Sequence, residues 1–412
     1  MSQPRASAWP AGAAARIGAA GGYGFVLLGL TDSMLGVAWP AIRQTFGEPL
    51  SALGLLLVAT AIGYVATAVP NGQLLNRFGA ARTLVTASLA ASVACTLLAL
   101  APTVWVLVAA ALLLGAASGA VDAGLNTVVA NDGPLRLLNA IHGAYGVGTV
   151  LGPILVTVAI VSAGSWRVPY GILIGAEALC ALGWWTVRPF TDAGRPAGQA
   201  GRFAGQAGWP AGQADRPARR AAPAPPRLEA GVAVAVGVAL VYAGAEFGVG
   251  QWAASYLRGV ASLRPAGAGF AVAGYWGVFA TARLVLALPG RQAAAELMMR
   301  AGCVVALAGA GLLWLGRGPA ISVAAFIVIG AGLAPVFPAL LSLTAVRFGA
   351  ARAQHVIGWQ LAAAGAGGQC ISALTGLLLG RLGLLALGPV LTVLVLLTLA
   401  ASALLSKLSP LA

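Results

Sequence analysis

Acidic residues inside apolar segments are the strongest candidates in this sequence for functional chemistry, namely the binding and release of a proton. Asp122 follows a long apolar run, because residues 103–121 carry no charge. At helical spacing, Ser118, Asp122 and Asn126 fall at i, i+4 and i+8, so their polar groups lie along one stripe of one helix. An ionisable group in hydrocarbon costs at least about 2.5–3.5 kcal/mol, so it normally faces a protein interior or a wet cavity. Asp122 is therefore a candidate functional residue.

Two further carboxylates share this setting. Asp32 lies in the first apolar segment, and Glu246 lies among Gly244, Gly248 and Gly250. Burial disfavours the charged form of a carboxyl group, whereas a nearby cation or donor favours it, so a site that fills and empties can exchange one proton per cycle. One charge moved through 100 mV is worth about 2.3 kcal/mol, or about fortyfold accumulation. The alternative for each residue is a structural hydrogen bond or close helix packing.

The composition indicates which elements must position these residues. Hydrophobic residues make up 59% of the 412 residues and charged residues 8%, which excludes a soluble globular fold. The apolar runs are continuous rather than alternating, so they predict helices and not a barrel. A spanning helix needs about 20 apolar residues. Twelve spans fit: 17–42, 51–75, 81–100, 104–130, 137–162, 168–187, 230–257, 265–288, 293–315, 319–346, 354–379 and 382–406.

The charge pattern predicts orientation rather than a nucleic-acid partner. The formal net charge is +14, but the basic residues are spread over the loops between the apolar segments. Most of them face the cytoplasm if both termini do, as the positive-inside rule requires. We therefore expect a multi-pass protein of a cell membrane with both termini cytoplasmic and no nucleic-acid partner.

The chain divides into two six-helix halves, residues 1–187 and 229–412. Between them, residues 188–228 hold three seven-residue repeats that begin with Ala-Gly-Gln-Ala, followed by an Arg- and Pro-rich stretch. Such a low-complexity basic segment cannot bury a core, so it predicts a disordered cytoplasmic linker. Six helices, a long linker and six helices are the layout of a transporter built from two parallel halves.

The connection between the second and third spans resembles a signature of the major facilitator superfamily. In GQLLNRFGAAR, Gly72, Arg77 and Gly79 match that signature, whereas Asn76 replaces its acidic residue and Arg82 alone remains of its basic cluster. The resemblance covers essentially the whole chain. It implies an all-α major facilitator fold in which the first, fourth, seventh and tenth spans line the cavity. It also implies a conformational role for this loop.

Within that superfamily, the chain is most similar to the bacterial fucose permease family of sugar and proton symporters. The similarity lies in residues 122–126, 242–252 and 332–343. Asp122 and Asn126 fall on a Glu and an Asn of that family's helix 4, and its helix 1 carboxylate falls one turn from Asp32. The resemblance implies a bacterial inner-membrane protein, in which Asp32, Asp122 and Glu246 carry proton coupling on three of the four cavity-lining helices.

Other polar and aromatic residues are candidate substrate contacts. Amides can bind hydroxyl groups and aromatic rings can stack on a sugar, although Trp and Tyr also gather at membrane interfaces. His142 is either a proton relay or a satisfied interior histidine. Glu177 also lies within an apolar segment, the sixth span (168–187). That span is peripheral in the fold that the resemblance implies, so we expect Glu177 to pair with another residue in a structural role. The candidate substrate contacts are Asn126, Gln251, Trp252, Tyr275, Trp276 and Gln360.

The sequence thus predicts a secondary active transporter: a proton-coupled symporter of a sugar or similar small polar solute. One alternative is a proton-driven antiporter that exports a drug or secondary metabolite, and another is a membrane sensor that has kept the fold and lost transport. No Walker A sequence, zinc-ligand spacing or Gly-x-Ser-x-Gly elbow occurs, so we expect no enzyme activity, catalytic residue, cofactor or metal. The expected partners are the solute, protons and the lipid bilayer, and we expect a monomer.

Overall fold

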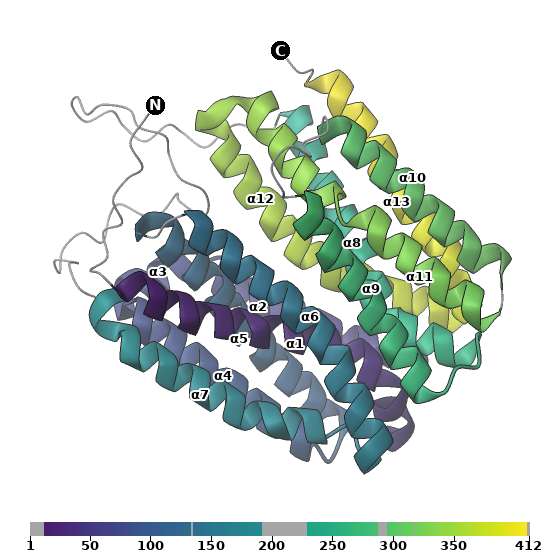
Figure 1. Cartoon of the computed structure of the whole chain (residues 1–412), viewed down its shortest axis with the longest axis horizontal. Coiled ribbons are helices and arrows are strands. Elements are labelled where there is room, and N and C mark those ends of the chain that lie inside the picture. The colour runs from purple at the N-terminus through teal and green to yellow at the C-terminus, as the bar shows by residue number, and fades with distance from the viewer. Residues whose placement is uncertain (1–11, 133–134, 192–228, 287–294, 317, 410–412) are drawn as a thin grey trace.

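Helices account for nearly the whole of the described structure. The computed structural model describes residues 12–132, 135–191, 229–286, 295–316 and 318–409, and within these ranges it contains helices and no strand. Twelve helical segments there are long and apolar enough to cross a membrane. The predicted fold class is therefore confirmed (Figure 1).

Each half of the chain contributes six of the candidate spans. The first half contains α1 (Ala13–Phe46), the short η1 (Leu50–Ala52), α2 (Leu53–Ala68), α3 (Asn71–Phe78), α4 (Ala80–Leu100), α5 (Val104–Asp132), α6 (Leu135–Ala163) and α7 (Val168–Thr191). The second half contains α8 (Ala230–Gly259), α9 (Pro265–Leu286), α10 (Ala295–Leu315), α11 (Pro319–Leu333), α12 (Val336–Leu382), the short η2 (Leu384–Ala386) and α13 (Leu387–Leu408).

Two predicted spans are divided differently in the structure. The predicted span 51–75 ends early: α2 stops at Ala68, and the separate amphipathic helix α3 follows Pro70. The predicted signature loop is thus mostly helical, and it turns into α4 at Gly79, whose φ of 86° suits glycine. The predicted span 319–346 is broken before Val336, where Pro335 cannot donate a helical hydrogen bond. The chain then reverses at Gly349, where φ is 71°.

The predicted linker falls almost wholly outside the described residues. Its first residues, up to Thr191, extend α7, and Glu229 directly precedes α8. The structure therefore describes the two helical halves and not the segment that joins them.

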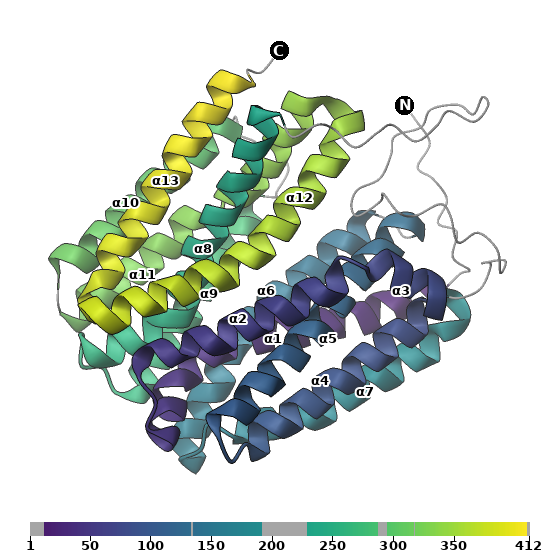
Figure 2. The same cartoon turned by 180° about the vertical axis from the view of Figure 1, so that it is seen from behind.

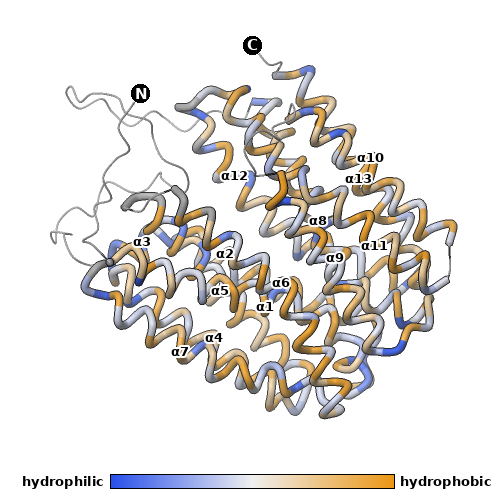
Figure 3. Tube along the Cα trace, viewed as in Figure 1, coloured by the Kyte–Doolittle hydropathy of each residue, from blue (hydrophilic) through white to orange (hydrophobic). Residues whose placement is uncertain are grey.

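The outer surface of the helices is apolar. Large hydrophobic side chains are widely exposed, among them Leu55, Ile62, Trp105 and Leu315. Figure 3 shows such residues distributed along the whole length of the helices. A soluble monomer rarely exposes apolar area on this scale, so the surface is suited to contact with lipid chains.

Contacts between the two halves concentrate toward one end of the bundle. We call the end that holds the start of α1 and the end of α13 the terminal side, and the opposite end the distal side. Helix pairs α1 and α8, α2 and α12, and α6 and α9 make the main contacts. At Gly36, in the distal part of α1, an added methyl carbon would lie 2.6 Å from the backbone oxygen of Gly250 in α8. The ribbons of the halves converge on the distal side and diverge toward the terminal side (Figure 2).

Candidate functional site

A close approach of α2 to α5 positions the first carboxylate. Gly115 and Gly119 of α5 lie against the backbones of Thr60 and Tyr64, as expected from their small size. At this separation the Tyr64 hydroxyl donates a short hydrogen bond to Oδ2 of Asp122. Two small residues thus allow a tyrosine of the neighbouring helix to hold the embedded carboxylate.

The hydrogen bonds of Asp122 continue along α5 to α6. Asn126 Nδ2 donates to Oδ1 of Asp122 over 2.8 Å, which follows from the i, i+4 spacing of the two residues. The Oδ1 atom of Asn126 lies 3.1 Å from Nε2 of His142. The His142 side chain is exposed, and its ring meets Phe25 edge-on. A continuous series of hydrogen bonds therefore joins a half-buried carboxylate to an exposed imidazole.

Asp32 of α1 is held in the same manner, by a tyrosine of α6. Gly29 of α1 lies against the backbone of Tyr145, and Gly148 of α6 lies against the backbone of Val26. The glycine-rich part of α6 is therefore a close-packing stripe, and it brings the Tyr145 hydroxyl within 3.0 Å of Oδ2 of Asp32. The backbone oxygen of Asp32 also accepts a 3.1 Å hydrogen bond from Nε2 of Gln251 in α8, which joins the halves beside the carboxylate.

Glu246 has a different set of partners, because it faces a cation. Arg283 of α9 places Nη2 3.5 Å from Oε2 of Glu246 and donates to the hydroxyl of Tyr242 over 3.0 Å. Its Nε donates to the backbone oxygen of Ala334 at the break between α11 and α12, and the guanidinium lies 4.1 Å from the centre of the Phe279 ring. This arrangement fixes the guanidinium among α8, α9 and the α11–α12 break.

The charged groups of the two halves face a common region. Asp32 and Asp122 interact electrostatically with each other, and Arg283 interacts with both Tyr145 and His142 of the other half. Two carboxylates of the first half thus lie opposite an ion pair of the second. A change of charge in one half therefore alters the electrostatic energy of the charged groups in the other half.

A cavity with a volume of about 30 Å³ adjoins Asp32 at this interface. Polar groups of both halves line it, among them Asp32, Ser118, Gln251 and Gln369. The Oε1 atoms of Gln251 and Gln369 are buried and accept no hydrogen bond. Since a buried unpaired acceptor is costly, these amide oxygens favour a ligand that donates hydrogen bonds. The rest of the wall is apolar and consists mainly of Leu35, Leu56, Leu57, Leu98, Ala111 and Leu114.

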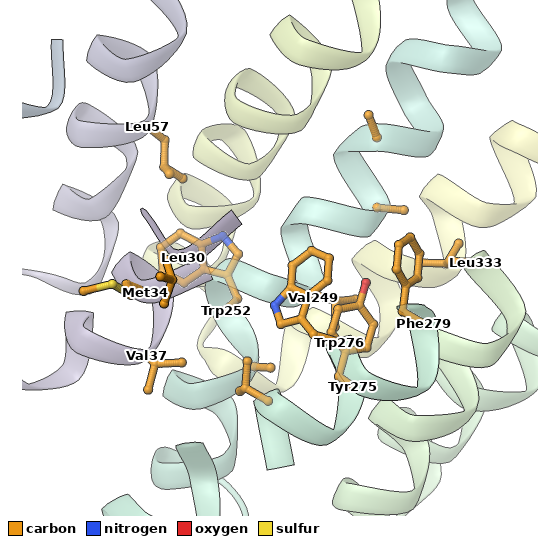
Figure 4. Close-up of a cluster of buried hydrophobic side chains, with 14 of the residues drawn as sticks. Leu30, Met34, Val37, Leu57, Val249, Trp252, Tyr275, Trp276, Phe279 and Leu333 are labelled. Carbon is orange, nitrogen blue, oxygen red and sulfur yellow. The ribbon is translucent and has the colours of Figure 1, made fainter. Parts of the chain in front are cut away.

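Several predicted substrate contacts make internal contacts in this conformation. Trp252 is fully buried and donates to the backbone oxygen of Ser372, and Tyr275 donates to that of Glu246. Trp276 packs on Gly250, as part of the aromatic cluster that reaches α1 in Figure 4. Gln360 is buried and bonds with Thr344. Their roles toward a substrate remain predictions, and Gln251 alone of the predicted contacts lines the cavity beside Asp32.

The predicted conformational residues lie apart from the carboxylates. Gly72, Asn76 and Arg77 belong to α3 on the terminal side, whereas Gly79 and Arg82 lie at the start of α4. Helix α3 is attached to the bundle by Asn71, whose Nδ2 donates to the backbone oxygen of Ala120 in α5. A movement of α5, the helix that carries Asp122, is therefore transmitted to this segment through the hydrogen bond.

Four residues of the site were not singled out as site residues from the sequence. Three have a signal that could have found them: Tyr64 and Tyr145 are polar residues within apolar spans, and Arg283 is a cation within another. Gln369 follows a glycine pair in a stretch of alanine and glycine, where neither charge nor spacing marks it as a site residue.

One family model matches most of the chain. The profile described as Major Facilitator Superfamily matches residues 22–373. The fold is similar to that of a bacterial homologue of the human lysosomal transporter Spinster, solved inward-facing and occupied, with a TM-score of 0.74 and 14% identity over 96% of this chain and 98% of that one.

Two further solved structures share the fold. The nucleoside transporter NupG gives a TM-score of 0.71 at 12% identity over 96% of this chain and 99% of the other. A peptide transporter, POT, in complex with alafosfalin gives 0.69 at 15% identity over 96% and 95%. Among curated proteins, no sequence relative matches the chain.

Proposed function

Because the chain belongs to the Major Facilitator Superfamily, and is therefore a membrane transporter rather than an enzyme, we propose that it is a proton-coupled symporter of a sugar or similar neutral polyhydroxylated solute. The two halves rock about the central site to expose it to each side of the membrane in turn. The membrane is a bacterial inner membrane, and the terminal side faces the cytoplasm, in keeping with the positive-inside distribution of charge.

The unpartnered amide oxygens in the central cavity are the observation that carries the substrate class. Gln251 and Gln369 come from different helices of the second half, and both present a buried acceptor to the space beside Asp32. A hydroxylated solute donates to both oxygens and leaves no buried acceptor unpaired. The hydroxyl of Ser118, which is half-buried, supplies a further donor or acceptor on the wall of the first half.

The two aspartates of the first half carry the proton in this proposal. Asp32 and Asp122 are held by tyrosine hydroxyls and, for Asp122, by an amide, and the described residues place no cation in hydrogen-bond contact with either. Each can therefore change charge without breaking an ion pair. Glu246 is engaged by Arg283, so it supports the second half and takes a smaller part in coupling.

The test is the sign of the pH change inside proteoliposomes. The purified protein is reconstituted with a pH-sensitive dye in the lumen, and a panel of neutral sugars and polyols is added outside. Symport carries protons inward with the solute, so one member of the panel acidifies the lumen. Asp122→Asn abolishes this signal, whereas Glu48→Gln keeps it, because Glu48 lies between α1 and η1 outside the spanning helices.

A different result selects a different function. The apolar remainder of the cavity wall favours the second candidate, export of an apolar drug or secondary metabolite by proton antiport. In that case the sugars give no response, and an apolar substrate added outside makes the lumen alkaline because protons leave as it enters. A folded protein that moves no proton with either panel contradicts transport and supports the sensor alternative.

A further inference from the structure

A second acidic pocket lies inside the first half, away from the interface between the halves. Helices α1, α4, α5 and α7 enclose it, and its cavity volume of about 10 Å³ is close to the space that one water molecule needs. Glu177 of α7 lines this pocket and is only 6% exposed. The proposed transport cycle above does not use this residue.

Glu177 has none of the structural partners expected from the sequence. Within the described residues its carboxyl group makes no hydrogen bond and no salt bridge. The titratable groups that face it are Tyr23 of α1, Cys95 of α4 and Cys180 of its own helix, and none of them is a cation. The Tyr23 hydroxyl is already engaged with the backbone oxygen of Ala176. A buried carboxyl group without a cation normally becomes neutral by binding a proton.

The pocket also offers polar groups that lack partners. Ser88 of α4 lines it and is fully buried, and its hydroxyl has no partner by distance and angle apart from the neighbouring thiol of Cys180. Ser118 of α5 also lines it and makes no side-chain hydrogen bond with the described residues. An unpaired buried hydroxyl costs about 1–3 kcal/mol, and water between it and a carboxylic acid removes that cost.

The same wall separates this pocket from the central cavity. Thr31, Leu114 and Ser118 line both spaces, and Asp32 directly follows Thr31 on α1. Thr31 donates to the backbone oxygens of its own helix, so its hydroxyl oxygen stays available as an acceptor. The two hydroxyl groups therefore lie on the wall shared by the pocket of Glu177 and the cavity that Asp32 lines.

We propose that Glu177 is a second proton-binding site, which exchanges its proton with the central cavity through water between Thr31 and Ser118. The proton leaves the carboxylic acid for a water molecule in the pocket and passes beside the two hydroxyl groups toward Asp32. The reverse transfer restores the acid. This site does not depend on the identity of the substrate or on the direction of its transport.

Infrared spectroscopy of the reconstituted protein tests this proposal without a substrate. At neutral pH the wild type has a carbonyl band of a protonated carboxyl group that Glu177→Gln lacks and Glu48→Gln keeps. Transfer into D₂O shifts the band as the proton exchanges for deuterium. Thr31→Val combined with Ser118→Ala slows this shift by about tenfold, which corresponds to about 1.4 kcal/mol in the exchange barrier.

Two outcomes overturn the proposal. A spectrum of Glu177→Gln identical to that of the wild type means that Glu177 holds no proton. A band that is lost in Glu177→Gln but never shifts in D₂O means that the proton is sealed in and serves structure alone. If Glu177→Gln fails to fold, Glu177→Asp keeps the acid and moves the band to a new frequency, and a spectrum without that movement contradicts the assignment equally well.

Discussion

The two halves of the molecule hold their embedded carboxylates in different ways. In the first half, Asp122 and Asp32 accept hydrogen bonds from Tyr64 and Tyr145, and the amide of Asn126 adds one more. In the second half, Glu246 faces the guanidinium of Arg283. A carboxyl group held by neutral donors can gain a proton and keep its neighbours, whereas one paired with a cation loses an ion pair when it does so.

This difference separates three residues that the sequence presented as equivalent. All three are acidic residues in spans that line the cavity in this fold, and the sequence assigned proton coupling to each. The structure surrounds the two aspartates with groups that tolerate either charge state, and it builds Arg283 into the break between α11 and α12 through the backbone oxygen of Ala334. We therefore propose that proton exchange belongs to the first half and that the ion pair of the second half gives mechanical support.

The largest expected effect comes from breaking the ion pair. Arg283→Met leaves Glu246 buried without a cation, and the loss of one partner of such a pair costs about 3 kcal/mol. The melting temperature of the purified protein in detergent falls accordingly. The double variant Glu246→Met with Arg283→Met recovers most of the loss because no charge is left unpaired. A double variant as unstable as the single one contradicts a supporting role for the pair.

The next effect concerns coupling. Asp122→Asn keeps the hydrogen-bonding shape of the side chain but cannot take up a proton. It loses accumulation driven by the proton gradient, which is about fortyfold for one proton and 100 mV, or about 2.3 kcal/mol. Exchange of labelled for unlabelled solute at equal concentrations continues. Proteoliposomes measure both activities with the same solute.

The matched comparison for Asp122→Asn is the double variant without Glu246 and Arg283. If proton exchange belongs to the first half, this folded double variant still accumulates solute when a pH gradient is applied. Loss of accumulation in the double variant, together with its retention in Asp122→Asn, would reverse the assignment of the two halves.

The sequence predicts local features of the site better than distant ones. The i, i+4 spacing predicted a shared stripe for Asp122 and Asn126, and the structure shows their hydrogen bond. The pairs Tyr64 with Asp122 and Tyr145 with Asp32 are 58 and 113 residues apart, so no periodicity within one helix can reveal them. They depend on how closely two helices approach each other at glycines, and that distance is set by the packing of the whole half.

The fold shows the same limit at the ends of its helices. Apolar content predicted the twelve spans, because length and hydropathy alone decide whether a helix can cross a membrane. It did not predict the end of α2 at Ala68, since Leu74 and Leu75 continue the apolar pattern beyond Pro70. The position of Arg283 beside Glu246 follows from the packing of α8 against α9, which no pattern within one helix can reveal.

Removal of single tyrosine hydroxyls sharpens the comparison at a smaller scale. Tyr242 is fully buried, and Tyr242→Phe leaves Arg283 and the backbone oxygen of Leu333 each short of one hydrogen bond, which costs about 1–2 kcal/mol. Tyr145→Phe costs less, because Asp32 lines a cavity whose water can replace the lost donor. The melting temperatures of the two variants report the difference, and equal losses would mean that the carboxylate of Asp32 is as inaccessible to water as the hydroxyl of Tyr242.

The smallest effect is expected at the exposed end of the hydrogen-bond series. His142 lies 3.1 Å from Asn126 and is exposed, so in the relay hypothesis it passes protons between Asp122 and water on the terminal side. His142→Gln keeps a donor for Asn126 but cannot be protonated. Because water also reaches this position, we expect proton-coupled uptake to slow by less than about tenfold, or 1.4 kcal/mol, while accumulation at steady state stays unchanged.

The initial rate and the final level of uptake in the same proteoliposomes separate these quantities. An unchanged rate leaves His142 as a positioning partner of Asn126, and a lost steady state places it on the coupling path together with Asp122.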